Sequence, residues 1–419
     1  MSATEPALVA PEVLNAVRTH LDDRFPAFLA DLEALVNTDC GSYTKEGVDH
    51  VGRWTQERLR TLGAHRVTSH ENDQDLGETV VAEFTGADPN GPTILCIGHM
   101  DTVFDPGTVA ERPFAIQGGI ATGPGVTDMK SGLLAGLYAI EALQAALGSL
   151  PVGRLVFVAN PDEEIGSPVS TPHIRRLAAD ADVCLVLECA RANGDIVSSR
   201  KGTMDLTISV HGRAAHAGVE PHKGRSAILE AARIITDLHA LNGRWDGVTV
   251  NVGVVDGGTR PNVVAERCTM EVDVRVVTRD GLEAVEAAIA EVLVPRVVPD
   301  VTISVDETAR HWPMEKLERS ERLVDHAMDV ASILGIDLQD AGTGGASDAN
   351  TTAGMGVPTI DGLGPIGGND HAPTEYLEVT SIVPRTVLLA GLIAAIGRDP
   401  EIRRWRAERL ARSGASGSR

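Results

Sequence analysis

Several features are missing from this 419-residue sequence, and each absence excludes a class of protein. Its five cysteines are an odd number and form no CxxC pair, so we expect reduced, buried thiols and no disulfide framework. The first residues lack the basic and apolar segments of a secretion signal. The longest apolar run, 387–396, is too short to span a bilayer. We therefore expect a cytoplasmic protein.

An excess of positive charge is also missing. The chain has 37 basic and 59 acidic residues, for a net charge of -22, which argues against nucleic acid or an anionic membrane as a partner. A hydrophobic content of 43% and a charged content of 23% are typical of a soluble globular protein. Because 419 residues exceed one ordinary core, we expect two domains.

Strands and helices alternate in the first and last parts of the sequence, which predicts an α/β domain with a mostly parallel sheet and flanking helices. The β-rich apolar runs predict strands at 79–84, 93–97, 154–160 and 183–187. Apolar residues at helical spacing predict helices at 12–36, 48–62, 131–147, 323–334 and 383–396. The arginine-rich tail after Arg398 is expected to be a solvated helix end that frays.

The middle of the chain has a different pattern. Its segments read β-α-β-β-α-β, at 204–210, 226–241, 248–255, 263–277, 281–293 and 301–305. This order is typical of a ferredoxin-like domain. We therefore predict a discontinuous first domain, 1–197 and 308–419, with an inserted domain at 198–307.

Groups that bind metals follow several of the predicted strands. They are His99 and Asp101, Asp128, Glu163 and Glu164, Glu188, and His371 in a later loop. The Glu163–Glu164 pair alone is more often a solvated turn. Many acidic groups at one sheet edge would repel one another, and bound cations relieve that repulsion. Imidazoles and carboxylates together suit zinc, cobalt or manganese.

Four motifs carry a resemblance that spans about residues 48–379. They are Gly98-His-Met-Asp-Thr-Val, Gly123-Pro-Gly-Val-Thr-Asp-Met-Lys, Asn160-Pro-Asp-Glu-Glu-Ile-Gly and the His371 loop. In this order they resemble the co-catalytic zinc metallopeptidases, a family of glutamate carboxypeptidases, succinyl-diaminopimelate desuccinylases, acetylornithine deacetylases and aminoacylases. The resemblance implies two divalent metal ions per chain, with zinc as the expected metal and cobalt or manganese as alternatives.

The resemblance also implies the ligands. By analogy, Asp128 bridges the two ions, His99 and Glu188 complete one site, and Glu164 and His371 complete the other.

Two further residues receive catalytic roles in the same way. Asp101 resembles the carboxylate that orients the ligand imidazole. Glu163 resembles the general base of an amide hydrolysis by metal-bound hydroxide. Met129 stands where the family usually has Asp or Asn, often after a cis peptide bond.

The inserted domain matches the family at three motifs. In relatives, the histidine equivalent to His216 reaches across a homodimer to stabilise the oxyanion, and the Asn262 equivalent assists. The Arg275 equivalent grips a substrate carboxylate, although a strand arginine alone is more often a surface residue. Backbone donors at Gly344 and Gly345 are expected near the same carboxylate.

Other functions fit the sequence less well. The segment Gly123–Ser131 lacks the glycine before Lys130 that a phosphate-binding loop needs, and no G-x-S-x-G motif is present. A non-catalytic binding protein of the same fold would be expected to lose ligands or base, yet all of them are present.

We therefore expect a metal-dependent amide hydrolase of the glutamate carboxypeptidase type. Such an enzyme releases a C-terminal amino acid from an N-acyl or peptidyl conjugate, so its substrate is a small molecule or short peptide with a free carboxylate. An N-acyl-amino-acid deacylase is the alternative.

Overall fold

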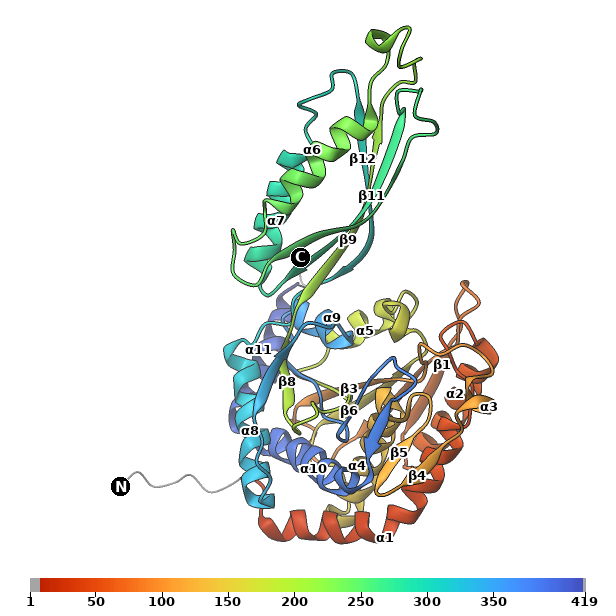
Figure 1. Ribbon diagram of the computed structural model, residues 1–419. Coiled ribbons are helices and arrows are strands. Elements are labelled where there is room, and N and C mark those ends of the chain that lie inside the picture. Colours follow the sequence, from red (N-terminus) through yellow and green to blue (C-terminus); the bar gives the residue numbers. More distant parts are fainter. Residues whose placement is uncertain (1–7, 417–419) are drawn as a thin grey trace. The chain divides into compact units, whose positions relative to one another are not determined.

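The computed structural model describes residues 8–416, and the chain divides into two compact units (Figure 1). The first unit consists of Met1–Ser199, Lys316–Gly342 and Ser347–Arg419, and the second of Arg200–Glu315 and Thr343–Ala346. The first unit is therefore discontinuous in sequence. Each unit has its own buried apolar cluster.

A six-stranded sheet forms the centre of the first unit, in the order β1-β2-β6-β3-β7-β14. The pairs β6/β3, β3/β7 and β7/β14 are parallel, whereas β1 and β2 add an antiparallel edge. Parallel pairing was predicted, but the antiparallel edge was not. The strands are β1 (Arg66–His70), β2 (Thr79–Thr85), β3 (Thr93–His99), β6 (Arg154–Asn160), β7 (Val183–Val186) and β14 (Thr359–Ile360).

Both faces of this sheet are covered. Ile94 and Cys96 of β3 belong to the large apolar cluster that also contains residues of α1, α4 and α10, and the alternate residues Leu95 and Ile97 are equally buried. Burial on both faces explains why these strands are continuously apolar. The first-unit helices are α1 (Pro11–Val36), α2 (Lys45–Thr61), α3 (Thr108–Glu111), α4 (Ser131–Leu147), α5 (Thr171–Ala178), α8 (Glu318–Leu334), α9 (Asp348–Gly354), α10 (Ile382–Arg398) and α11 (Pro400–Ser416).

Helix α10 packs against α1, α4 and α8. The stretch Val379–Arg398, which includes α10, is long and apolar enough to cross a membrane, and most of it is buried inside the first unit. This stretch is longer than the apolar run recognised in the sequence. Because its apolar residues lie in the core, packing accounts for its hydrophobicity.

Short strands complete the first unit. A small antiparallel sheet has the order β15-β16-β5-β4, and a two-stranded sheet pairs β8 with β13. The small sheet joins a segment near residue 120 to one near residue 376. These strands are β4 (Ala115–Gln117), β5 (Ile120–Thr122), β8 (Ile196–Arg200), β13 (Asp340–Thr343), β15 (Gly367–Gly368) and β16 (Tyr376–Glu378).

The second unit has the predicted β-α-β-β-α-β order, with strands arranged as β10-β11-β9-β12, all antiparallel. Ser226 and Thr278 cap its two helices by accepting hydrogen bonds from backbone N–H groups. Strand β12 runs beyond residue 307, where the inserted domain was expected to end. The elements are β9 (Gly202–His211), α6 (Ala227–His239), β10 (Thr249–Gly257), β11 (Arg267–Val276), α7 (Arg279–Val292) and β12 (Thr302–His311).

The prediction of a fraying C-terminal tail was wrong for the first part of α11. Arg403 forms an ion pair with Asp88 at 2.7 Å, and Arg409 Nε donates to Asp182 at 2.8 Å. Trp405 is buried in the core of the first unit. The sequence shows a run of arginines but cannot show the distant carboxylates that pair with them.

Replacing Asp182 tests how firmly α11 is attached. Its buried carboxylate accepts hydrogen bonds from Arg409 and from the backbone N–H of Thr93, so Asp182→Ala removes the acceptor of both bonds. We expect a loss of about 2–4 kcal/mol in the free energy of unfolding, measured by urea titration. Asp180→Ala, at a side chain that is 73% exposed, is the control and should change stability by less than about 0.5 kcal/mol. Equal losses in both variants would contradict this assignment.

Candidate metal centre

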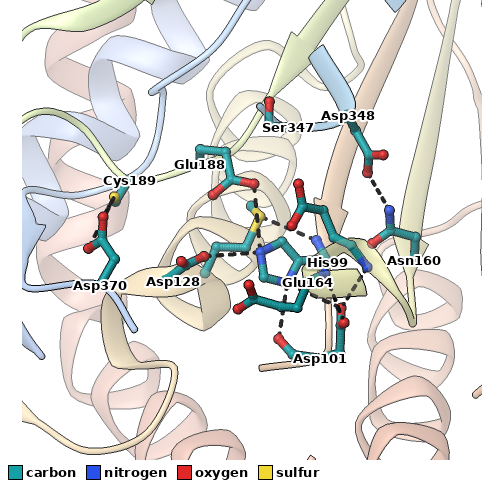
Figure 2. A network of polar contacts seen from close by, with 12 residues as sticks. His99, Asp101, Asp128, Asn160, Glu164, Glu188, Cys189, Ser347, Asp348 and Asp370 are labelled. Atoms are coloured by element: carbon teal, nitrogen blue, oxygen red, sulfur yellow. Dashed lines mark hydrogen bonds and ion pairs between the residues drawn. The ribbon is translucent and has the colours of Figure 1, made fainter. Parts of the chain in front are cut away.

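Three adjacent parallel strands end at the same edge of the sheet and bring polar side chains together there. In the register of β3 and β6, His99 is paired with Asn160, and Ile97 is paired with Val186 of β7. Glu188 follows β7 by two residues. The short turn η2 (Glu163–Ile165) follows β6. Parallel strands thus bring four of the predicted site residues, His99, Glu163, Glu164 and Glu188, to one edge, as Figure 2 shows for three of them.

Asp128 reaches this edge from a different element. It lies in the turn η1 (Val126–Lys130), between β5 and α4, and its peptide bond to Met129 is cis. Helix α4 approaches β7 so closely that a Cβ atom on Gly132 would lie 1.9 Å from the carbonyl oxygen of Leu187. Only glycine fits there, and its presence brings the start of α4 next to the residue before Glu188.

His371 lies in the loop between β15 and β16. Its side chain is 57% exposed, and its Nε2 is 3.2 Å from Asp128 Oδ2 and 3.0 Å from Glu164 Oε2. On the other side of Asp128, the Nε2 atom of His99 lies 3.1 Å from Asp128 Oδ1 and 3.6 Å from Glu188 Oε1. The five predicted ligands therefore form two groups that share Asp128, one carboxylate oxygen facing each group.

Each group has the composition of a metal site. The ligand atoms of His99, Asp128 and Glu188 lie within 4.8 Å of one another, and so do those of Asp128, Glu164 and His371. One imidazole and two carboxylates per group match the nitrogen and oxygen donors that zinc and manganese accept. The shared aspartate is suited to bridging two ions.

Charge balance supports the same assignment. Hydrogen bonds to Asp128 and Glu164 raise the pKa of His371 to about 11. Burial lowers the pKa of His99, but the carboxylates of Glu188, Asp101 and Asp128 outweigh it and hold that pKa well above its usual range. The neighbouring carboxylates thus favour the protonated form of both imidazoles, which serves as a counter-charge. A divalent cation can take over that role.

Asp101 connects the first imidazole to the turn that carries Glu163 and Glu164. The Nδ1 atom of His99 lies 3.0 Å from the backbone carbonyl oxygen of Asp101 and 3.3 Å from its carboxylate Oδ1. The same buried carboxylate accepts hydrogen bonds from the backbone N–H groups of Glu163 and Glu164, each at 3.1 Å, and from Ser42 Oγ at 2.7 Å. Asp101 therefore positions η2 in addition to contacting the imidazole.

Glu163 belongs to neither ligand group. Burial and the neighbouring carboxylate of Glu188 raise its pKa well above the usual range. A second buried carboxylate, Asp348, fixes the chain on both sides of η2. It accepts a hydrogen bond from Asn160 Nδ2 before this turn (Figure 2) and another from Ser167 Oγ, at 2.7 Å, after it. Glu163 is thus a carboxylate with raised proton affinity on a well-anchored turn.

Glu375 holds the turn that carries Asp128. Its carboxylate is 1% exposed and accepts hydrogen bonds from the backbone N–H groups of Gly125 and Thr127 at 2.8 Å, and of Asp128 at 3.1 Å. Glu375 follows His371 by four residues, so a single short loop provides one predicted ligand and orients another. Sequence reasoning missed Glu375, because nothing in the sequence marks a glutamate that binds backbone groups 250 positions away.

The remaining predicted residues lie in the second unit. The backbone N–H of Ala217, next to His216, donates to the carbonyl oxygen of Asn262 at 3.0 Å, so these two predicted residues are close together. Arg275 forms an ion pair with Asp273 at 2.8 Å and is 36% exposed. Gly344 and Gly345 lie in an exposed loop, where Arg200 donates to the Gly345 carbonyl oxygen at 3.1 Å.

Comparison with known proteins identifies the family. A sequence model described as peptidase family M20/M25/M40 matches residues 95–395. The chain belongs to this family. The match includes all five predicted ligands, His99, Asp128, Glu164, Glu188 and His371.

Individual relatives agree with this assignment. Carboxypeptidase G2 of Pseudomonas sp. (strain RS-16) is 28% identical over 381 residues, which cover 90% of each protein. Succinyl-diaminopimelate desuccinylase of Dechloromonas aromatica (strain RCB) is 28% identical over 311 residues, 70% of this chain and 80% of that protein. The crystal structure of aminopeptidase PepT from Bacillus cereus ATCC 10987 has the same fold, with a TM-score of 0.74, 24% identity, and coverage of 89% of this chain and 98% of that one. The chain is a metal-dependent hydrolase of amide bonds, as the sequence motifs predicted.

Metal binding should release protons. Because neighbouring carboxylates raise the pKa of both His99 and His371, ions that occupy the two groups must displace imidazole protons. Zinc titrations in two buffers of different ionisation enthalpy should report this release, and affinity should fall as the pH is lowered from about 8 to about 6. His371→Gln should release fewer protons than the unaltered protein. Metal binding without proton release would contradict the charge balance described above.

Glu375→Ala should weaken metal binding without removing a ligand. Loss of three backbone hydrogen bonds frees the Asp128 turn, so we expect metal affinity to fall about 10–100-fold. Competition with a chromogenic chelator measures this affinity. Glu378→Ala, in the adjacent strand β16, is the control and should retain the original affinity. If both variants bind metal equally well, Glu375 does not orient Asp128.

Proposed function

We propose that this enzyme uses two divalent ions, with zinc as the expected metal, to release a C-terminal amino acid from an N-acyl or peptidyl conjugate. One observation supports this proposal above the others: two ligand groups share Asp128, and Glu163 lies on the same turn as the ligand Glu164 without belonging to either group. A two-metal hydrolase needs such a free carboxylate beside its ligands.

His99 and Glu188 would hold one ion, and Glu164 and His371 would hold the other. Asp128 would bind both ions. Ions bound there supply Lewis acidity toward a water molecule and toward the carbonyl oxygen of the substrate. The sharing of Asp128 and the closeness of the two groups support this arrangement.

Glu163 carries the proton in the proposed reaction. Its carboxylate accepts a proton from the attacking water as the new C–O bond forms, and then delivers it to the nitrogen of the leaving amino acid as the C–N bond breaks. The raised pKa of Glu163 favours proton uptake. The hydrogen bonds from η2 to Asp101 hold the base beside the ligands throughout.

The second unit provides the proposed substrate contacts. Arg275, oriented by Asp273, has the planar donor geometry for a carboxylate, with the backbone of Gly344 and Gly345 assisting. His216 and Asn262 would stabilise the oxyanion. In this proposal His216 acts across a homodimer of cytoplasmic subunits.

Carboxypeptidase activity is favoured by the similarity to carboxypeptidase G2 across 90% of both chains. The similarity to a succinyl-diaminopimelate desuccinylase keeps N-acyl-amino-acid deacylation as the second candidate. Both activities cleave the same type of bond. They differ in which part of the substrate the enzyme selects.

Glu163→Gln should separate metal binding from chemistry. The amide cannot accept the proton, so we expect kcat to fall by at least about 10²–10⁴-fold while the metal content stays unchanged. The measurements are metal analysis and steady-state kinetics. Glu164→Gln is the contrasting variant, because it should lower the metal content as well as the activity. A near-normal rate in Glu163→Gln would remove Glu163 as the base.

A hydrolysis screen tests the function itself. Purified protein loaded with zinc, cobalt or manganese would be incubated with N-acyl amino acids, dipeptides and matching substrates with an amidated C-terminus. We expect turnover that chelators abolish and that requires a free carboxylate. Turnover that ignores chelators would contradict the metal mechanism, and equal turnover of amidated substrates would contradict the carboxypeptidase assignment.

A further inference from the structure

A pocket of about 210 Å³ lies beside the second ligand group, entirely within the first unit. Glu164 belongs both to the wall of this pocket and to the group with Asp128 and His371. Its volume is below the roughly 300–1,000 Å³ of pockets that enclose a whole drug-sized ligand. The pocket is thus sized for one substituent of a molecule whose reacting bond lies at the metal centre.

The walls of this pocket are mostly apolar. They include Tyr43, Val103, Phe104, Pro106 and Ile165. The Tyr43 side chain is 81% exposed and that of Val103 is 40% exposed. An aromatic ring that contributes so little to the core is available to stack on a bound group.

Backbone contacts hold the two sides of the pocket together. The N–H of Thr102 donates to the Cys40 carbonyl oxygen at 3.0 Å, and the N–H of Ser42 donates to the Thr102 carbonyl oxygen at 3.2 Å. A Cβ atom on Gly41 would lie 2.3 Å from the Phe104 carbonyl oxygen, so the close approach requires glycine. Since Ser42 Oγ also donates to Asp101, the rim that carries Tyr43 is fixed to the centre that holds the ligands.

Phe104 is also held in place by a cation–π contact with Arg112. The guanidinium group of Arg112 lies 4.7 Å from the centre of the Phe104 ring, and its Nη1 donates to the Pro373 carbonyl oxygen at 3.0 Å. Pro373 lies in the loop that carries His371. The Arg112 side chain therefore contacts both the apolar wall and the loop that carries His371, so it links the two.

The charge of the pocket decides which part of a substrate it accepts. The residues that line it include the carboxylates of Asp105 and Glu164 and no lysine, arginine or histidine. Glu164 is already paired with His371, and none of the lining residues offers a substrate carboxylate a cationic partner, whereas an uncharged apolar group would be bound by the walls. The carboxylate-bearing half of the substrate thus belongs elsewhere.

We propose that the pocket of Tyr43, Val103, Phe104 and Ile165 is the acyl-side specificity site, and that it selects an apolar or aromatic acyl group over a short or anionic one. This inference rests on the proposed amide hydrolysis and adds the substrate class. In this proposal the enzyme differs in specificity from any relative whose substrate has a negatively charged acyl group.

The test is a series of N-acyl derivatives of one amino acid, with acetyl, hexanoyl, benzoyl and succinyl groups, hydrolysed by the metal-loaded full-length protein. We expect kcat/KM for the hexanoyl and benzoyl compounds to exceed that for the acetyl compound by at least about tenfold. The kcat/KM for the succinyl compound should be equal to or lower than that for the acetyl compound. Equal kcat/KM across the series would overturn the proposal.

Two substitutions assign the preference to this pocket. Val103→Lys adds a cation to an exposed wall position, so it should lower kcat/KM for the hexanoyl compound and raise it for the succinyl compound, changing their ratio by at least about tenfold. Ile333→Lys makes the same charge change at an exposed position on α8 and should leave the ratio unchanged. Tyr43→Ser should reduce the ratio of kcat/KM for the benzoyl compound to that for the acetyl compound. Tyr43→Phe keeps the ring and should retain this ratio. Unchanged ratios in Val103→Lys and Tyr43→Ser would overturn the proposal.

Binding separates this inference from the proposed function. The same compounds would be titrated into metal-loaded Glu163→Gln and into Glu163→Gln combined with Val103→Lys. If no compound is hydrolysed by the unaltered protein but the apolar compounds bind most tightly and Val103→Lys reverses that order, the pocket assignment holds and the hydrolase proposal fails. Turnover without any such order in binding or rate overturns the pocket assignment alone. If neither turnover nor binding is seen, both are overturned.

Discussion

Repulsion among crowded carboxylates is the constraint on which the architecture of the first unit depends. Asp128, Glu164 and Glu188 meet at one sheet edge with Glu163 beside them, and two imidazoles provide the counter-charge. Such a cluster persists only if each carboxylate is held in place by its own hydrogen bonds or by a cation. The supporting groups are accordingly buried and specific: Asp101 under η2, Asp348 beside it, and Glu375 under the Asp128 turn.

The predicted site residues come from two kinds of scaffold, the ends of parallel strands and the loops beside the small sheet. His99 ends β3, and Glu164 and Glu188 follow the neighbouring parallel strands β6 and β7, so the sheet brings the three to one edge and Asp101 then positions the turn of Glu164. Asp128 and His371 come from loops beside the small sheet of β5 and β16. Loops lack such a register, and Glu375 provides the missing restraint through three backbone hydrogen bonds.

The two scaffolds differ in how far the sequence predicts them. His99 was recognisable because it ends an apolar, β-rich run, and β6 was predicted with its observed bounds for the same reason. Asp128 and His371 were recognised only through the motifs around them. Glu375 and the partners of the C-terminal arginines were not predictable, since their contacts join positions far apart in the chain and leave no local pattern. Local patterning thus reveals elements and ligands, whereas the distant contacts that orient them appear only in the folded chain.

The Glu375 contact has a consequence for biosynthesis. The predicted ligands extend from residue 99 to residue 371, and the turn that presents Asp128 is restrained by a side chain made about 250 residues later. A ribosome-bound chain that has already formed β3, β6 and β7 therefore holds His99 and Glu188 but lacks both His371 and the restraint on Asp128. All five groups and the restraint on Asp128 are present together only after residue 375 has been made, so metal binding and hydrolysis require most of the chain, with α10 and α11 still to follow.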